Sequence, residues 1–332
     1  MDIRRVQITG GSSFTISLPK DWIRAQSIEK NSPVGLSIQS DGTLLVCPHI
    51  DRGRVEKSKV FDLDESDIPI TFRLLIGTYV MGFSSVTIKK KGGLPPEVID
   101  AAMEFTQKAI GPEIIEEGEN AIVIKDLLNP TKMPFDKTLE RMYILVRYMH
   151  SDSMAAFIDG RTSLVDDIEQ RDLEVDRLNW FLAHQYNIIN DSNLALTTDF
   201  SGEDSKFYFV SGKILERIGD HSVLIANQSK QLLEHEGPTG LEAPLRDASQ
   251  FSLELLDKAI YSWFHRDLGA ANETVDSIVK LRALCEKVEN LSHSMNEEHA
   301  IATGKVVDSI LRTGEYSTDI AENAINYMIL SI

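Results

Sequence analysis

Apolar and polar positions alternate with a period of two over the first fifty residues, which predicts a series of short strands. Val6 and Ile8 start the alternation, and residues 14–18 and 34–38 continue it. The Asp41–Gly42 pair predicts a tight hairpin turn before the next apolar run. Because fifty residues with so few apolar side chains cannot build a stable core, the pattern predicts that two copies combine.

Residues 51–130 contain segments with the period of a strand and segments with the period of a helix, which predicts a small α/β unit. A strand is expected near Val60, a helix over 71–81 and a second strand over 85–88. Pro95 and Pro96 open a second helix that ends at Gly111, and the apolar run 122–124 predicts a last strand.

From about residue 135 onward the apolar positions follow the helical period to the end of the chain. We expect six amphipathic helices, over 135–159, 162–189, 204–235, 243–266, 268–301 and 303–331. The cluster Gly237-Pro238-Thr239-Gly240 divides them into two triplets, which predicts two three-helix bundles. The expected fold class is therefore α+β, with domains at 1–50, 51–134, 135–236 and 241–332.

The two helical triplets carry matching segments. GDHSVLIAN at 219–227 aligns with GEYSTDIAE at 314–322, sharing a glycine, an acidic residue, a serine and an Ile-Ala pair. LEVDRL at 173–178 aligns less closely with EKVENL at 286–291. The pattern indicates a diverged internal duplication.

Composition places the chain among folded proteins that do not enter a membrane. Of its 332 residues 42% are hydrophobic, and the mean hydropathy is -0.15. No apolar run approaches the ~18 residues needed to cross a bilayer, and we expect no signal peptide. The two cysteines are far apart in sequence and form no CxxC pair, as expected for a cytoplasmic protein.

The net charge of -17 is concentrated in the second half of the chain. Residues 1–150 hold 19 basic and 20 acidic side chains, whereas 151–332 hold 15 basic and 31 acidic ones. An acidic surface repels nucleic acid backbones but suits cations or a basic partner. Any contact with DNA is therefore expected from the first fifty residues, through Arg4, Arg5, Thr15, Ser17 and Lys20.

Four acidic residues form the clearest candidate site. Glu216 and Asp220 are four apart and share one helix face, and Asp172 and Asp176 repeat this spacing on the preceding helix. If the two helices are neighbours, the four carboxylates converge and a bound cation would offset their repulsion. Such a donor set favours Mg, Ca, Mn or Fe over a structural zinc.

The alternative interpretation is that these carboxylates form surface salt bridges and bind nothing. Three arginines lie close to them in sequence and could neutralise them: Arg171, Arg177 and Arg217. Acidic pairs four residues apart are common on exposed helices, so spacing alone does not separate the two interpretations.

The second triplet offers a weaker version of the same site. The positions equivalent to the four acids are Cys285, Glu289, Leu311 and Glu315, so two of the four carboxylates are missing. Asp319 and Glu322 add others nearby, and we expect any weaker metal site to use Glu289, Glu315 and Asp319.

No arrangement of nucleophile, base and oxyanion hole is recognisable in the sequence, so we do not expect an enzyme. His221 directly follows Asp220 and could join a metal site or form a surface hydrogen bond. Cys285, within a helix, is expected to be a small buried hydrophobic residue.

The motif LERIGDHSVLIAN, its diverged copy GEYSTDIAE and the preceding RDLEVDRL resemble the signature of the PhoU family of phosphate-uptake regulators. This resemblance covers roughly 135–332. It implies tandem three-helix bundles whose acidic motifs bind metal clusters, and it falls on Asp172, Asp176, Glu216 and Asp220. It leaves open a divalent or trivalent ion, with Fe, Mn, Mg and Zn as the candidates.

The segment VQITGGSSFTISLPKDWI, with the Asp-Gly hairpin before Leu44, resembles an AbrB/SpoVT-type swapped-hairpin domain. For the whole chain the similarity is to archaeal PhoU-like regulators that carry such a domain in front. The resemblance implies a module on residues 1–50 that forms a homodimer and binds DNA.

Together these observations predict a non-enzymatic, cytoplasmic regulator of phosphate uptake and phosphate signalling. It would bind metal in its helical bundles and act on a phosphate transporter or a sensor kinase. The alternative is a DNA-binding transcriptional regulator whose helical half senses a metal or another ligand.

Overall fold

The structure is a computed structural model that describes residues 2–38, 42–48, 57–128, 133–191, 202–231 and 240–330. It divides into two compact units, 1–54 and 55–332. The first is a small unit of short strands, and the second joins an α/β layer to six long helices, so the predicted α+β fold class is confirmed. Residues 50, 51 and 236, at the predicted domain boundaries, lie outside the described residues.

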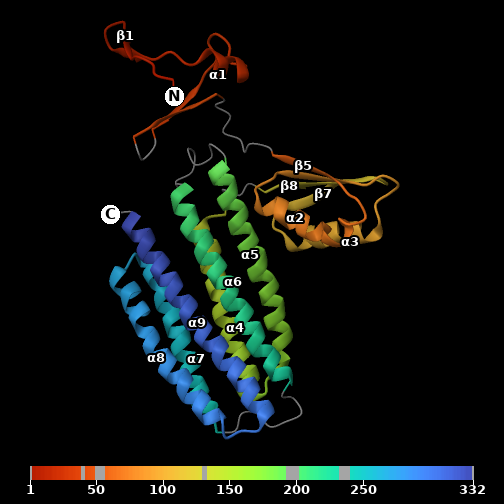
Figure 1. Cartoon of the computed structure of the whole chain (residues 1–332), viewed down its shortest axis with the longest axis vertical. Helices are drawn as coiled ribbons and strands as arrows, with labels where there is room; N and C mark the ends of the chain where they lie inside the picture. Colours follow the sequence, from red (N-terminus) through yellow and green to blue (C-terminus); the bar gives the residue numbers. More distant parts are fainter. Residues whose placement is uncertain are drawn as a thin grey trace. The chain divides into compact units, whose positions relative to one another are not determined.

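The N-terminal unit consists of two antiparallel hairpins and one short helix (Figure 1). Strands β1 (Gln7–Thr9) and β2 (Ser13–Thr15) pair across the Gly10–Gly11 turn. Helix α1 (Lys20–Ala25) follows Pro19. Strands β3 (Gly35–Ile38) and β4 (Leu44–Cys47) then pair, although Asp41 of the predicted turn lies outside the described residues.

Apolar side chains of the N-terminal unit are left uncovered. Among its described residues only Cys47 is a buried hydrophobic side chain, at 5% exposure. Phe14 is 74% exposed and Ile38 81% exposed. Further apolar side chains on or next to the strands are also exposed, namely Ile8, Ile16, Leu36, Leu44 and Leu45. This unit therefore has an apolar surface without a core of its own.

The second unit begins with a four-stranded sheet in the order β5-β6-β8-β7. Strand β5 (Ser58–Asp62) runs parallel to β6 (Ser85–Lys89), and β8 (Ala121–Asp126) is antiparallel to both β6 and β7 (Pro112–Glu117). The sequence predicts the other three strands but misses β7, an edge strand with four acidic or proline positions in six residues.

Two helices cover one face of this sheet and complete its core. A 3-10 turn (Ile68–Ile70) leads into α2 (Thr71–Val80), and α3 (Pro96–Lys108) starts behind Pro95. Their apolar sides bury Val86, Ile88, Ile122 and Ile124 of the sheet together with Phe181 of a later helix. The α/β layer thus shares its core with the helical region.

Six long helices follow and form two groups of three (Figure 1). The first group is α4 (Phe135–Asp159), α5 (Val165–Asp191, after a 3-10 turn at Thr162–Leu164) and α6 (Gly202–Gln231). The second is α7 (Glu242–His265), α8 (Leu268–Ser292) and α9 (Glu297–Leu330). Except for Gly240, the glycine–proline cluster predicted to separate them lies outside the described residues.

One predicted helix boundary is wrong. The sequence places the break between the last two helices at 301–303, but the structure ends α8 at Ser292 and starts α9 at Glu297. Asn296 supplies the reason, because its Oδ1 accepts the backbone N–H of His299 at 2.9 Å and so caps the new helix. The apolar period runs on across this break and hides it in the sequence.

The two groups meet along α4–α7 and α6–α9, and part of this junction is polar. His150 of α4 is fully buried there, with Nε2 3.0 Å from Ser249 Oγ and Nδ1 3.4 Å from Thr313 Oγ1. Burial, followed by the charge of His221, lowers the pKa of His150 to about 4. This histidine is therefore neutral, and its uncharged ring is hydrogen-bonded between the two groups of helices.

Candidate functional site

The structure brings the four acidic residues together across the α5–α6 contact. Asp172 and Asp176 lie on α5, and Glu216 and Asp220 lie on α6. Gly219 lies at this contact, where a Cβ atom would be 3.4 Å from Asp172 Oδ1, an ordinary van der Waals distance. We call these four residues the acidic cluster.

Electrostatics confirm that the carboxylates of the acidic cluster influence one another. Burial raises the pKa of Asp172 to about 7, helped by the charges of Asp176, Asp220 and Glu216. Burial and the charges of Glu216 and Asp220 raise the pKa of Asp176 to about 6. The pKa of Asp220 is raised by burial and then by Glu216. Three aspartates whose pKa is raised partly by neighbouring carboxylates indicate a site of excess negative charge.

Of the three arginines of the salt-bridge alternative, one compensates the acidic cluster in the part of the chain that the structure describes. Arg171 pairs with Asp152, and the buried Nε of Arg177 has no hydrogen-bond partner. The charge of Arg217 opposes the raised pKa of Asp220, although its guanidinium also lies 5.9 Å from the ring centre of Tyr316. Lys213 compensates the cluster more directly, because its Nζ lies 2.5 Å from Glu216 Oε1. This lysine is not among the residues predicted from the sequence, although its position three residues before Glu216 is a recognisable pairing signal.

The donor set of the acidic cluster suits a hard cation. Glu216 Oε2 is buried and has no hydrogen-bond partner, so one carboxylate oxygen of the cluster is left uncompensated. Within the described ranges, however, no three histidine, cysteine or acidic side chains are close enough to hold one ion. Binding would require the four side chains to rotate toward a common centre, and the metal site remains a prediction.

The raised pKa of Asp172 leads to a prediction for the metal-free protein. In its folded state Asp172 keeps its proton up to a pH of about 7, so ionisation costs stability as the pH rises from 4 through 7. We expect Asp172→Asn to stabilise the chain by roughly 2 kcal/mol at pH 8 after solvent screening is allowed for. Near pH 4 the gain should disappear, because there the wild-type side chain is already neutral when folded.

Melting curves in chelator at pH 4, 6 and 8 test this prediction. Asp167→Asn, the same substitution at an exposed position of α5, should give an offset that does not change with pH. A constant offset for Asp172→Asn as well would show that Asp172 carries no ionisation penalty.

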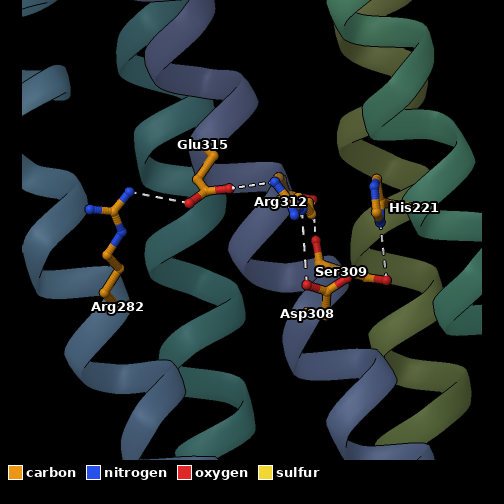
Figure 2. Close-up of polar contacts among 7 residues, drawn as sticks. His221, Arg282, Asp308, Ser309, Arg312 and Glu315 are labelled. Carbon is orange, nitrogen blue, oxygen red and sulfur yellow. Dashed lines mark hydrogen bonds and ion pairs between the residues drawn. The ribbon is translucent and has the colours of Figure 1, made fainter.

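The second group of helices neutralises the equivalent position with its own side chains. Figure 2 shows Glu315 of α9 between two guanidinium groups: Arg282 of α8 donates to it at 3.2 Å and Arg312 at 3.0 Å. Arg312 also lies 3.9 Å from Asp308. A carboxylate engaged by two arginines is a poor metal ligand, so the charge of Glu315 is compensated by side chains of its own group of helices.

The structure also describes the surroundings of the other residues of the weaker predicted site. Cys285 is buried, and burial followed by the charges of Glu289 and Glu315 raises the pKa of its thiol to about 12. The thiol is thus the small buried hydrophobe that the sequence predicts. Glu289 is exposed, and burial followed by Glu322 and Glu315 raises the pKa of Asp319. A second metal site stays a prediction.

His221 makes a hydrogen bond across the two groups of helices. Its Nδ1 lies 3.2 Å from Ser309 Oγ of α9 (Figure 2). Its ring lies 5.7 Å from that of Tyr316. Of its two predicted roles, the structure shows the hydrogen bond.

The residues predicted to contact DNA all lie on the N-terminal unit and are exposed. Thr15 ends β2 and donates to the carbonyl oxygen of Gln7 at 3.4 Å, and Lys20 opens α1. Arg4 pairs with Asp2 at 3.3 Å. Arg5 and Ser17 are likewise accessible, so the unit presents polar groups beside its exposed apolar ones.

Two protein families match the chain, one near its N-terminus and one in its helical region. Residues 139–229 match the PhoU domain, and residues 7–53 match the family described as antidote-toxin recognition MazE, bacterial antitoxin. No curated protein matches the sequence. The PhoU match covers α4, α5 and most of α6, and so includes the whole acidic cluster.

Solved structures of PhoU share the fold. The crystal structure of PhoU from Pseudomonas aeruginosa has a TM-score of 0.53 at 19% identity, and covers 60% of this chain and 96% of that one. The phosphate transport system regulatory protein PhoU from Streptococcus pneumoniae has a TM-score of 0.51 at 15% identity, and covers 60% of this chain and 94% of that one.

The fold and the two matches define the class: a protein with tandem three-helix bundles of the PhoU type behind a MazE/AbrB-type N-terminal region. The chain contains a PhoU domain at residues 139–229. In the described residues no helix is long and apolar enough to cross a lipid bilayer.

Proposed function

We propose that the protein regulates phosphate uptake without being an enzyme, through bundles that bind a divalent or trivalent cation and contact a phosphate transporter or its sensor kinase. The observation that carries this proposal is the acidic cluster inside a PhoU domain, with four mutually repelling carboxylates and one unpartnered buried oxygen. The similarity to a phosphate transport system regulatory protein supports the biological setting. We place the regulator in the cytoplasm.

Phosphate uptake by cells that lack this chain tests the proposal. Loss of the chain should raise the uptake of labelled phosphate in phosphate-rich medium, and the wild-type gene should restore the lower rate. The Glu216→Gln/Asp220→Asn variant should restore it poorly at an equal protein level. Equal uptake with and without the chain would contradict the proposed function.

The N-terminal match supports a second candidate function, a DNA-binding regulator whose helical half is a sensor. Exposed cationic and hydroxyl groups on residues 1–50 suit contacts with phosphate groups of DNA, whereas the acidic bundles would repel them. Binding to DNA upstream of the protein's own gene would favour this candidate.

We expect Arg5→Glu/Lys20→Glu to weaken any DNA binding regardless of sequence. Each lost phosphate contact reduces the dependence on salt by about one unit in the log–log slope, so the variant should bind weakly and with a flatter slope. Fluorescence anisotropy with a labelled duplex between 50 and 300 mM KCl measures both. Arg312→Glu, a charge reversal on the helical bundles, is the control. Unchanged DNA affinity of the double variant would show that the N-terminal unit does not bind DNA.

A further inference from the structure

The α/β layer is joined to the helical bundle by a buried histidine whose two ring nitrogens both face acceptor atoms. His184 of α5 has Nδ1 2.5 Å from the carbonyl oxygen of Tyr79, in α2, and Nε2 2.9 Å from Asp126 Oδ2, in β8. Its ring also stacks on that of Tyr79, with the ring centres 4.1 Å apart. One side chain of α5 therefore contacts both a helix and a strand of the layer.

These two contacts fix the number of protons that the histidine and the aspartate share. The carbonyl oxygen of Tyr79 can only accept, so Nδ1 of His184 must carry a proton. A second proton must lie between Nε2 and Asp126 Oδ2, because otherwise two lone pairs would face each other. The docked pair thus holds two protons. In an unfolded chain at pH 8 the same two side chains hold one, because the ordinary pKa is about 6.5 for histidine and about 3.9 for aspartate.

The surroundings of the pair place the second proton on the histidine and keep water away from it. The backbone N–H of Leu128 donates to Asp126 Oδ1 at 3.1 Å, and a donor at that oxygen favours the ionised carboxylate. The side chains of His184 and Asp126 are only 1% and 4% exposed. Loss of the proton would therefore leave a buried contact between two acceptors, which costs free energy.

Other titratable groups on the surrounding elements point elsewhere. In α2 the hydroxyl of Tyr79 donates to a backbone carbonyl oxygen at 2.8 Å. In β8 Lys125 directly precedes Asp126, so the two side chains point to opposite faces of the sheet. Positions 180–188 of α5 include no acidic residue, lysine or arginine. In the part of the chain that the structure describes, Asp126 is therefore the charged group that contacts His184 directly.

We propose that the pair of His184 and Asp126 makes the docking of the α/β layer on α5 dependent on pH. Below about pH 6 the pair holds two protons whether the layer is docked or released, so docking is at its strongest. As the pH rises, only the docked pair keeps the second proton, and docking weakens because the released state binds fewer protons. The proposal does not rest on cation binding by the acidic cluster.

Hydrogen–deuterium exchange of the full chain at pH 6.0 and 8.5, read by mass spectrometry, tests the proposal. After correction for the intrinsic exchange rate, peptides from α2 and β8 should lose protection roughly threefold or more at the higher pH. Peptides from α8, which does not contact the layer, should not show this loss. A loss that is equal in α8, or no loss in α2 and β8, would overturn the proposal.

Asp126→Asn provides a matched variant that keeps both contacts without the carboxylate. The amide oxygen can still accept from Leu128, while the amide nitrogen donates to Nε2 of a neutral His184. Between pH 6.0 and 8.5 the wild type should lose roughly 3–5 °C more in melting temperature than this variant. His293→Gln removes an exposed histidine and should behave as the wild type does. Parallel curves for the wild type and Asp126→Asn would overturn the proposal, and the exchange measurement decides it even if the variant does not fold.

Discussion

Mn²⁺ is expected to raise the melting temperature of the chelator-treated wild type, and Glu216→Gln/Asp220→Asn is expected to abolish the rise. An ion that binds only the folded chain adds RT ln(1 + [L]/Kd) to its stability, about 2.7 kcal/mol at a hundred times Kd. In a unit of this size that corresponds to roughly 5–10 °C. The variant also removes two of the carboxylates that repel one another in the acidic cluster. Its metal-free form should therefore melt at or above the wild-type temperature.

Melting curves with Mn²⁺, Mg²⁺ and Fe²⁺ against chelator provide the measurement. Glu289→Gln/Glu315→Gln is the matched control, in which two acids are removed at the equivalent positions of the second group of helices. It should melt lower because Glu315 loses its arginine contacts, yet keep the full metal-induced rise. A wild type that does not respond to metal, or a first-site variant that responds fully, would leave the carboxylates without an ion-binding role.

The full chain is expected to be a homodimer held together by residues 1–50. This unit exposes Phe14 and Ile38 by 74% and 81%, and its two hairpins have too few side chains to cover them. Light scattering should give twice the chain mass of 37.2 kDa. A chain starting at residue 57 should give the single mass.

Substitutions in the full chain provide a sharper test of the dimer. Phe14→Asp/Leu36→Asp should convert the dimer to a monomer, because the charges would lie inside a paired apolar face. In a monomer both positions are solvated and the change would have little effect. Val279→Asp, at a 68% exposed position of α8, is the control and should remain a dimer. A truncated chain that still dimerises would place the interface elsewhere.

Long periodic patterns explain why most of the helical half is predictable from the sequence. Helix α4 occupies the predicted range, because an apolar stripe of that length with the helical period predicts a single amphipathic helix. Strand β7 escapes prediction because a bulge between Ile114 and Glu116 interrupts its alternation. The start of α9 escapes because the capping Asn296 is a local signal inside a continuous apolar period.

The candidate site is likewise only partly predictable from the sequence. Spacing of four residues places each acidic pair on one helix face. The compensating charges are different, because Arg282 of α8 reaches Glu315 of α9 only through the packing of one helix on the other, 33 residues away in sequence. No periodicity in one segment records a contact of that kind.

The pairing of Glu315 with two arginines distinguishes the two groups of helices at equivalent positions. Glu315 has fixed cationic partners, whereas Glu216 has one lysine partner and one buried oxygen without a hydrogen bond. Under the proposed cation binding, a change in the ions of the medium would act first on α5 and α6. The hydrogen bond between His221 of α6 and Ser309 of α9 connects that position to the second group of helices.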